Sequence, residues 1–61
     1  MKIINYNILR HPNPEALENA VRHSINNGWQ PYGNLVVEPI FINNQETLFY
    51  IQTMVAYQAE E

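Results

Sequence analysis

Few side chains in this sequence are of the types that carry out nucleophilic or acid–base chemistry. The candidate nucleophiles are Ser24, Thr47 and Thr53, and the candidate bases are His11 and His23. A hydroxyl nucleophile needs an adjacent base and a third group that orients that base. The chain contains no aspartate and no nucleophile-elbow motif. We therefore predict that the protein is not an enzyme; an active site would require a histidine and a glutamate to converge across a subunit boundary.

A metal site is equally hard to assemble from these residues. The chain has no cysteine, and zinc takes three or four ligands, which here would have to come from the two histidines and the glutamates. We expect four of the glutamates to lie on solvated surfaces and not to be grouped as metal ligands: Glu15, Glu18, Glu38 and Glu46. We predict no metal and no other cofactor.

Aromatic and amide side chains gather in one short segment, residues 28–34, which also holds both glycines. Tryptophan and tyrosine are over-represented at the energetic centres of protein interfaces, and their rings can stack on a planar ligand. We therefore predict that four residues of this segment bind a ligand or a partner: Trp29, Gln30, Tyr32 and Asn34. The alternative is that Trp29 ends a helix and packs against the domain.

The elements that would position this segment begin with a strand over residues 2–9, where apolar side chains alternate with asparagines. A helix should follow, because Asn13 suits the N-cap and Pro14 suits the first helical position. Its apolar side chains recur every fourth residue. The helix should end at Asn26 or Asn27, with Gly28 in the left-handed position that terminates many helices.

Two further strands are predicted over residues 34–42 and 47–58, joined by a turn at residues 43–46. Pro39 cannot donate a hydrogen bond to a neighbouring strand, so its strand should be an edge or be bulged there. The last strand is rich in β-forming residues on both faces and should be central. These features predict one α+β domain over residues 1–61, an antiparallel sheet in the order 1-3-2 with one helix packed on it. The alternative order is 1-2-3, with the first two strands parallel.

The small size of the chain predicts self-association. The chain has 61 residues, of which 46% are hydrophobic, and no disulfide can reinforce its core. One helix can cover only one face of a three-stranded sheet, although the sequence does not indicate which face. A second copy of the chain is the simplest cover for the other face. We predict an oligomer interface that includes Leu48, Tyr50 and Met54.

The charge balance argues against nucleic acid as a partner. The net charge is −3, and the chain has three lysine and arginine residues, too few for a phosphate-binding patch. No apolar run approaches the roughly 20 residues that cross a bilayer. The N-terminus lacks the apolar stretch of a signal peptide. The sequence therefore predicts a cytoplasmic protein without a membrane partner.

Two segments of the chain resemble a known family. One is Gly28-Trp29-Gln30-Pro31-Tyr32-Gly33, and the other is the run Tyr50-Ile51-Gln52-Thr53-Met54-Val55. Together they are similar to the domain of unknown function 1737 family of small bacterial and bacteriophage proteins, with Thr53 where that family is expected to have alanine. The resemblance spans nearly the whole chain. It implies a bacterial or phage origin but no catalytic residue.

These observations lead to two hypotheses about function. The first is a non-enzymatic, homo-oligomeric protein-interaction module, an accessory protein that acts on a host component if the gene belongs to a phage or prophage. The alternative is a protein that binds a planar or nucleotide-like small molecule at its subunit interfaces.

Overall fold

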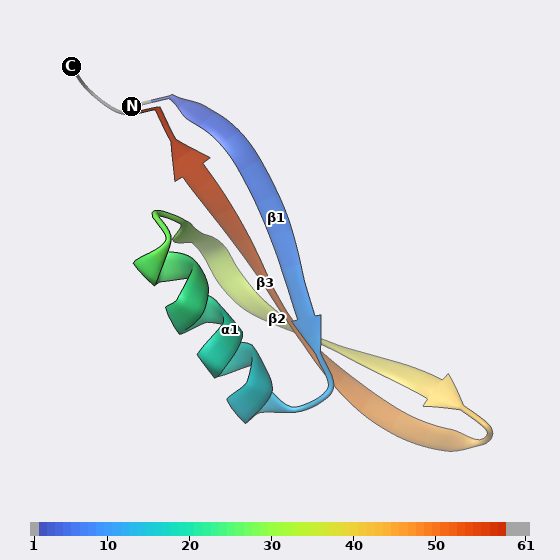
Figure 1. Cartoon of the computed structure of the whole chain (residues 1–61). Coiled ribbons are helices and arrows are strands. Elements are labelled where there is room, and N and C mark those ends of the chain that lie inside the picture. The colour runs from blue at the N-terminus through green and yellow to red at the C-terminus, as the bar shows by residue number, and fades with distance from the viewer. Residues whose placement is uncertain (1, 59–61) are drawn as a thin grey trace.

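The computed structural model describes residues 2–58 as a three-stranded sheet with one helix (Figure 1). The elements follow one another in the predicted order. Their bounds are β1, Ile3–His11; α1, Pro14–Asn26; β2, Gln30–Ile42; and β3, Gln45–Tyr57.

The sheet has the strand order β1-β3-β2, and both neighbouring pairs are antiparallel. This confirms the predicted order and excludes the alternative with a parallel first pair. The long β3 is central because it can bury side chains on both of its faces. Pro31 and Pro39 both lie on β2, an edge strand, where one side of the backbone needs no ladder partner.

The helix α1 begins and ends as its sequence predicts. The side chain of Asn13 accepts hydrogen bonds from the backbone N–H groups of Glu15, at 2.8 Å, and Ala16, at 3.4 Å. At the other end Gly28 has a φ of 91°. Its N–H donates to the carbonyl of Ile25 at 3.1 Å, and the N–H of Trp29 donates to that of Ser24 at 3.0 Å. These two bonds form a Schellman motif, which satisfies the last carbonyls of the helix.

The two longer strands extend further than the sequence predicts. Strand β2 begins at Gln30, so Pro31 and Gly33 lie within it rather than at its entry. The turn that joins β2 to β3 consists of only Asn43 and Asn44, with φ values of 52° and 64°. Positive φ at both central residues is the signature of a type I′ turn, whose twist matches that of the strands it joins.

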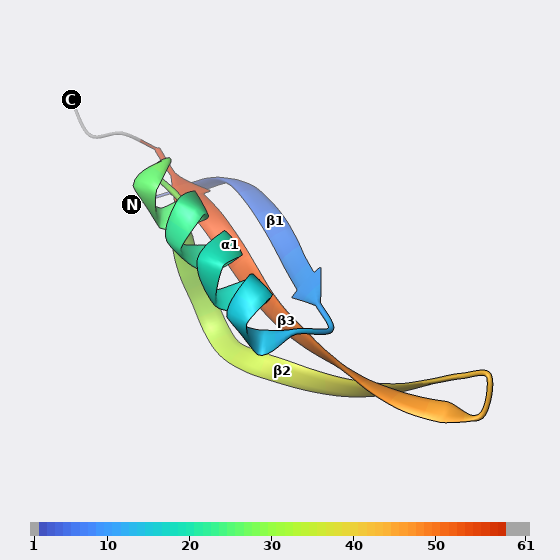
Figure 2. The same ribbon diagram turned by 60° about the horizontal axis from the view of Figure 1, so that its bottom comes forward.

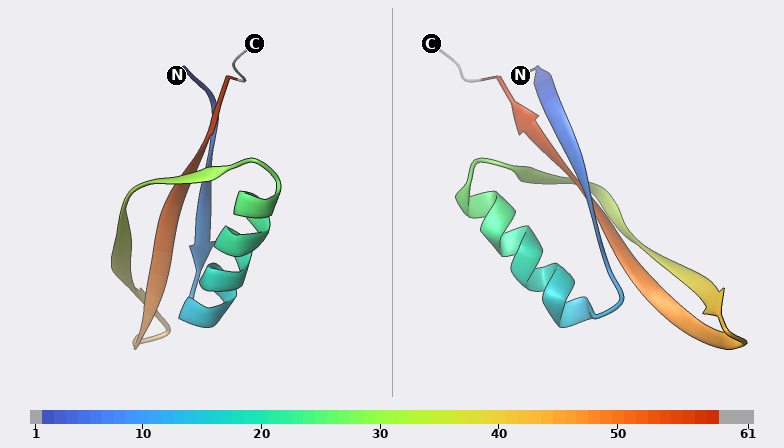
Figure 3. Two further views of the ribbon diagram at one scale, coloured as in Figure 1. Left: turned by 90° about the vertical axis from the view of Figure 1, so that its left-hand side faces the viewer. Right: turned by 45° about the vertical axis from the view of Figure 1, so that its right-hand side comes forward.

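The helix lies along one face of the sheet and leaves the other face open (Figures 2 and 3). Within residues 2–58, few apolar residues are buried: Leu17, Met54 and Val55. Met54 was expected at the oligomer interface, but it is completely buried, with 0% of its surface exposed. The face of β3 that carries Met54 is the face under α1, and its part in an oligomer interface stays a prediction.

The outer parts of β2 and β3 form an arm, residues 37–50, that projects past the helix (Figure 1). The molecule measures 53 × 18 × 15 Å, and its Cα radius of gyration is 13.8 Å. A compact chain of this length would have a radius of gyration of about 10.5 Å. At its root the arm contacts β1, whose His11 pairs with Tyr50. Beyond that root the arm extends into solvent, and no third strand of residues 2–58 pairs with it.

Candidate functional site

The sheet is interrupted where β2 passes the helix. Tyr32 pairs with Thr53 and Val36 pairs with Ile51, so residues 33–35 of β2 lie opposite the single residue Gln52 of β3. Gly33 has a φ of 78°, a backbone conformation that favours glycine. The irregularity is a bulge with two extra residues, and it moves the backbone of β2 away from its partner.

Gln52 supplies the hydrogen bonds that this bulge would otherwise lack. Its side-chain nitrogen donates to the carbonyl oxygens of Tyr32 and Gly33, each at 3.4 Å, and of Thr53 at 3.0 Å. Only 8% of Gln52 is exposed, although it is polar. A buried amide in a strand of apolar residues is tolerated because its donor group is paired.

An open, mainly apolar groove of about 350 Å³ lies between α1 and the sheet. Its floor includes Gln52, with Tyr50 beside it and Leu35 from the bulge. The helix supplies the remaining lining residues, Pro14, Leu17, Glu18, Val21 and Arg22. Because Tyr50 is also the last β3 residue of the arm, the groove opens directly onto the arm.

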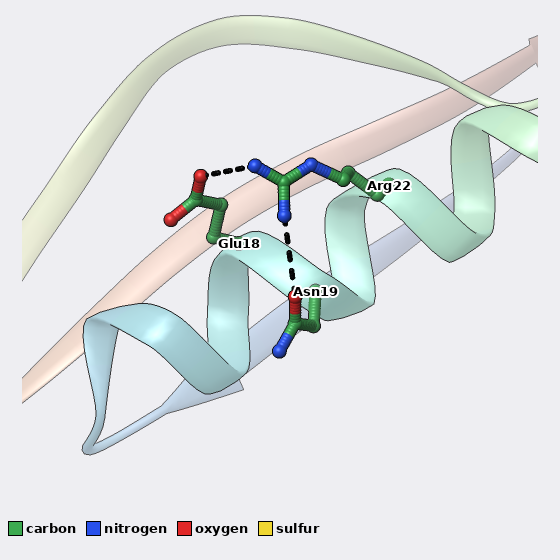
Figure 4. A network of polar contacts seen from close by, with 3 residues as sticks. All are labelled: Glu18, Asn19 and Arg22. Carbon is green, nitrogen blue, oxygen red and sulfur yellow. Dashed lines mark hydrogen bonds and ion pairs between the residues drawn. The ribbon is translucent and has the colours of Figure 1, made fainter.

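The rim of the groove carries one cation, which is already engaged within the helix. Arg22 forms an ion pair with Glu18, four residues before it on the helix, and donates to the side-chain oxygen of Asn19 at 3.2 Å (Figure 4). Both partners of the ion pair are more than half exposed. The guanidinium therefore remains accessible to a further anionic group at the rim.

The face of the sheet without the helix is apolar and exposed. Residues that pair directly across an antiparallel sheet point to the same face, so the pairs Tyr6–Val55, Ile8–Thr53, Tyr32–Thr53 and Val36–Ile51 share the face opposite Gln52. The outer strands contribute four well-exposed side chains, which we call the open-face surface: Tyr6 (68%), Ile8 (56%), Tyr32 (54%) and Val36 (53%).

A charged pair borders the open-face surface at the base of the arm. The guanidinium carbon of Arg10 lies 4.9 Å from the centre of the Phe49 ring. A guanidinium nitrogen of Arg10 is 3.3 Å from Glu38 Oε1. Arg10 thus reaches from β1 over an aromatic ring of β3 to a carboxylate of β2, which ties the three strands together at this point.

The four residues predicted to bind a ligand or partner do not line the groove. Tyr32 and Gln30 point to the open face, Asn34 is in the bulge, and Trp29 is half-buried at the end of the helix. That one ligand contacts all four residues therefore stays a prediction, and such a site would require an assembly of several chains. Of the predicted interface residues, Leu48 and Tyr50 lie on the arm, on the side that carries the helix.

The candidate catalytic and metal-binding groups remain apart. In residues 2–58, no hydrogen bond joins a histidine to a serine, threonine or glutamate; His23 contacts Asn27, at 3.4 Å. Nor does this part of the chain contain a group of three or more acidic or histidine side chains placed to hold a metal ion. Within the same residues, no helix is long and apolar enough to cross a membrane.

The family model for a domain of unknown function (DUF1737) matches residues 3–59, nearly the whole chain. The chain belongs to the DUF1737 family. No curated protein and no solved structure matches it. In this DUF1737 protein the two segments that carry the resemblance meet in space, because Gln52 of one segment hydrogen-bonds the Tyr32 and Gly33 carbonyls of the other.

Sequence reasoning missed three parts of this region: the role of Gln52, the groove and the arm. The signal for the first was visible, since Gln52 is a lone amide in a run of apolar and β-branched residues. A polar residue that interrupts such a run is buried only with partners. The groove and the arm depend on where the helix stops relative to the strands, which no local pattern indicates.

Proposed function

We propose that this chain is a non-enzymatic interaction module that assembles with copies of itself through the open-face surface. The observation that carries the proposal is the amount of surface the single chain exposes. Its accessible area is 4883 Å², whereas a compact monomer of its mass exposes about 4,100 Å². The difference is similar to the roughly 800 Å² that each partner buries in a standard protein interface.

The chemistry of the open-face surface favours a second copy as its cover. Its four members are two tyrosines, an isoleucine and a valine, and the half-buried Ile51 and Thr53 lie between them. Both charged groups at its border, Arg10 and Glu38, are already paired with each other. A surface without unpaired charge can meet its own copy across a two-fold axis without electrostatic repulsion.

The proposal also follows from how little the single chain buries. Leu17, Met54 and Val55 are the buried apolar residues of the described chain. A single small core of this kind supplies only about 3–5 kcal/mol of stability or less. Burial of the open-face surface against another copy would add buried apolar surface to a chain that has little of its own.

Under this proposal the assembly works in the cytoplasm of a bacterium, or of a phage-infected cell, by binding a host protein. The family resemblance supports the bacterial or phage setting. The composite surfaces of an oligomer support partner binding, because they offer a partner more contact area than one chain of this size.

Sedimentation velocity over a wide range of protein concentration tests self-association. We expect the wild type to sediment as two or more copies and the Ile8→Glu variant to lose the open-face contact, since it would bury an unpaired carboxylate. Ile25→Glu is the matched control, because Ile25 is 48% exposed on the helix. A wild type that is monomeric throughout, or an Ile8→Glu variant that assembles like Ile25→Glu, would contradict the proposal.

A further inference from the structure

The arm has an apolar side that no part of the described chain covers. On the side of the sheet that carries the helix, it presents four side chains, which we call the arm surface: Val37, Pro39, Phe41 and Leu48. Phe41, one residue from the end of β2, is 70% exposed, more than any other large apolar residue in residues 2–58. Leaving an aromatic ring at the tip of a hairpin in water is costly, since its burial stabilises by about 1.5–3 kcal/mol.

The arm surface is continuous with the groove beside the helix. Tyr50 lines the groove, and Leu48, two residues before it, lies on the same side of β3. On β2, Leu35 lines the groove, and Val37 follows it on the arm. One apolar strip therefore runs from the groove, at the root of the arm, to Phe41 at its tip.

We propose that two copies of the chain pack their arms antiparallel, so that Phe41 of each copy enters the groove of the other. This interface deepens the proposed function, because it rests on the chain assembling with itself. The antiparallel arrangement places each tip over the other copy's root, and the two-fold symmetry makes both insertions equivalent. The groove, at about 350 Å³, is within the size range of sites that bury small ligands, about 300–1,000 Å³, and can receive an aromatic ring.

Charge complementarity favours this occupant. Glu46 pairs with Phe41 across the hairpin and therefore lies on the same side of the arm. Glu46 forms no ion pair within residues 2–58, and the arm holds no lysine or arginine. The groove has Arg22 on its rim. Arg22 is paired with Glu18, which also lines the groove, but its guanidinium is more than half exposed. Insertion of Phe41 brings the Glu46 carboxylate beside this guanidinium, which can pair with both carboxylates.

Disulfide cross-linking tests the contact directly, because the chain has no cysteine of its own. A Phe41→Cys chain and a Glu18→Cys chain, one of them carrying a mass tag, are refolded together and oxidised gently. Glu18 is exposed and lines the groove, so its replacement leaves the core intact. We expect a disulfide-linked heterodimer. The matched control is Ile42→Cys in place of Phe41→Cys, because Ile42 is also at the tip but points to the opposite side of the arm.

Sedimentation of cysteine-free variants separates this inference from the proposed function. If each chain uses both the open-face contact and the arm contact, the wild type assembles into more than a dimer. Phe41→Ser should then leave only the open-face dimer. Ile42→Ser should keep the mass of the wild-type assembly. The arm contact alone would be overturned by two results together: the wild type assembles but the Phe41→Cys and Glu18→Cys chains do not cross-link, and the Phe41→Ser and Ile42→Ser assemblies have equal mass. A wild type that is monomeric at every concentration would overturn both proposals.

Discussion

The side-chain amide of Gln52 donates to the carbonyl oxygen of Gly33 across the central and edge strands, at 3.4 Å. The two residues are separated by 19 positions in the chain, yet each explains the other. Gly33 allows the backbone of β2 to leave its ladder, and Gln52 replaces the hydrogen bond that the ladder loses there. The bulge in turn brings Leu35 to the groove.

Replacement of Gln52 by leucine should destabilise the fold even though the side chain is nearly the same size. The Tyr32 and Gly33 carbonyls would lose a donor in a part-buried site, which costs about 1–3 kcal/mol. We expect the midpoint of urea unfolding to fall accordingly, measured at a fixed protein concentration because assembly also affects stability. A leucine variant as stable as the wild type would show that water satisfies these carbonyls equally well.

Gln52→Glu should destabilise the fold more than Gln52→Leu does at neutral pH. The introduced carboxylate accepts hydrogen bonds but cannot donate them, so it repels the three carbonyl oxygens that the amide now serves. Protonation of that carboxylate restores a donor. The stability deficit relative to the wild type should therefore shrink as the pH is lowered, as measured by urea unfolding at several pH values. A deficit independent of pH would contradict this account.

The sequence predicted the helix and the strand order well because both depend on nearby residues. Asn13 and Gly28 mark the helix ends through hydrogen bonds that span only a few positions. Pro39 indicates an edge strand through its own missing donor. The face that carries the helix was not predictable, since β3 is apolar on both faces. That ambiguity is why Met54 was expected at an interface, although it is buried under α1 in the single chain.

The two glycines of the family motif should be sensitive to alanine for conformational rather than steric reasons. Gly28 and Gly33 have positive φ, and a Cβ at either position would meet no atom within 4 Å. We expect Gly28→Ala and Gly33→Ala each to lower the free energy of unfolding by about 1–2 kcal/mol, the cost of a left-handed conformation for an L-residue. Asn34→Ala, an exposed change in the same bulge, serves as the control and should cost less.

The type I′ turn should determine whether the arm forms in its observed register. Asn43 and Asn44 both have positive φ, which asparagine and glycine tolerate better than other residues. We expect Asn44→Ala to cost about 1–2 kcal/mol and Asn44→Gly to retain stability. Hydrogen exchange of the backbone amides on the arm would show the difference as faster exchange in the alanine variant. Equal protection in the two variants would mean that side-chain pairing alone maintains the arm.

The ion pair between Arg10 and Glu38 offers a test of whether the open face is buried in solution. Both side chains are about half exposed in the single chain, at 48% and 51%, where such a pair contributes only about 0.2–1 kcal/mol. If a second copy covers the neighbouring open-face surface, water is excluded and removal of one partner leaves a buried charge, at a cost of about 3–5 kcal/mol. Glu38→Gln should therefore weaken assembly far more than Glu15→Gln, a matched change at an exposed position of α1. Sedimentation of both variants in low and high salt distinguishes the two cases. If the pair is exposed, Glu38→Gln weakens assembly slightly, and salt abolishes the difference. If the pair is covered, Glu38→Gln weakens assembly strongly, and the difference persists in high salt.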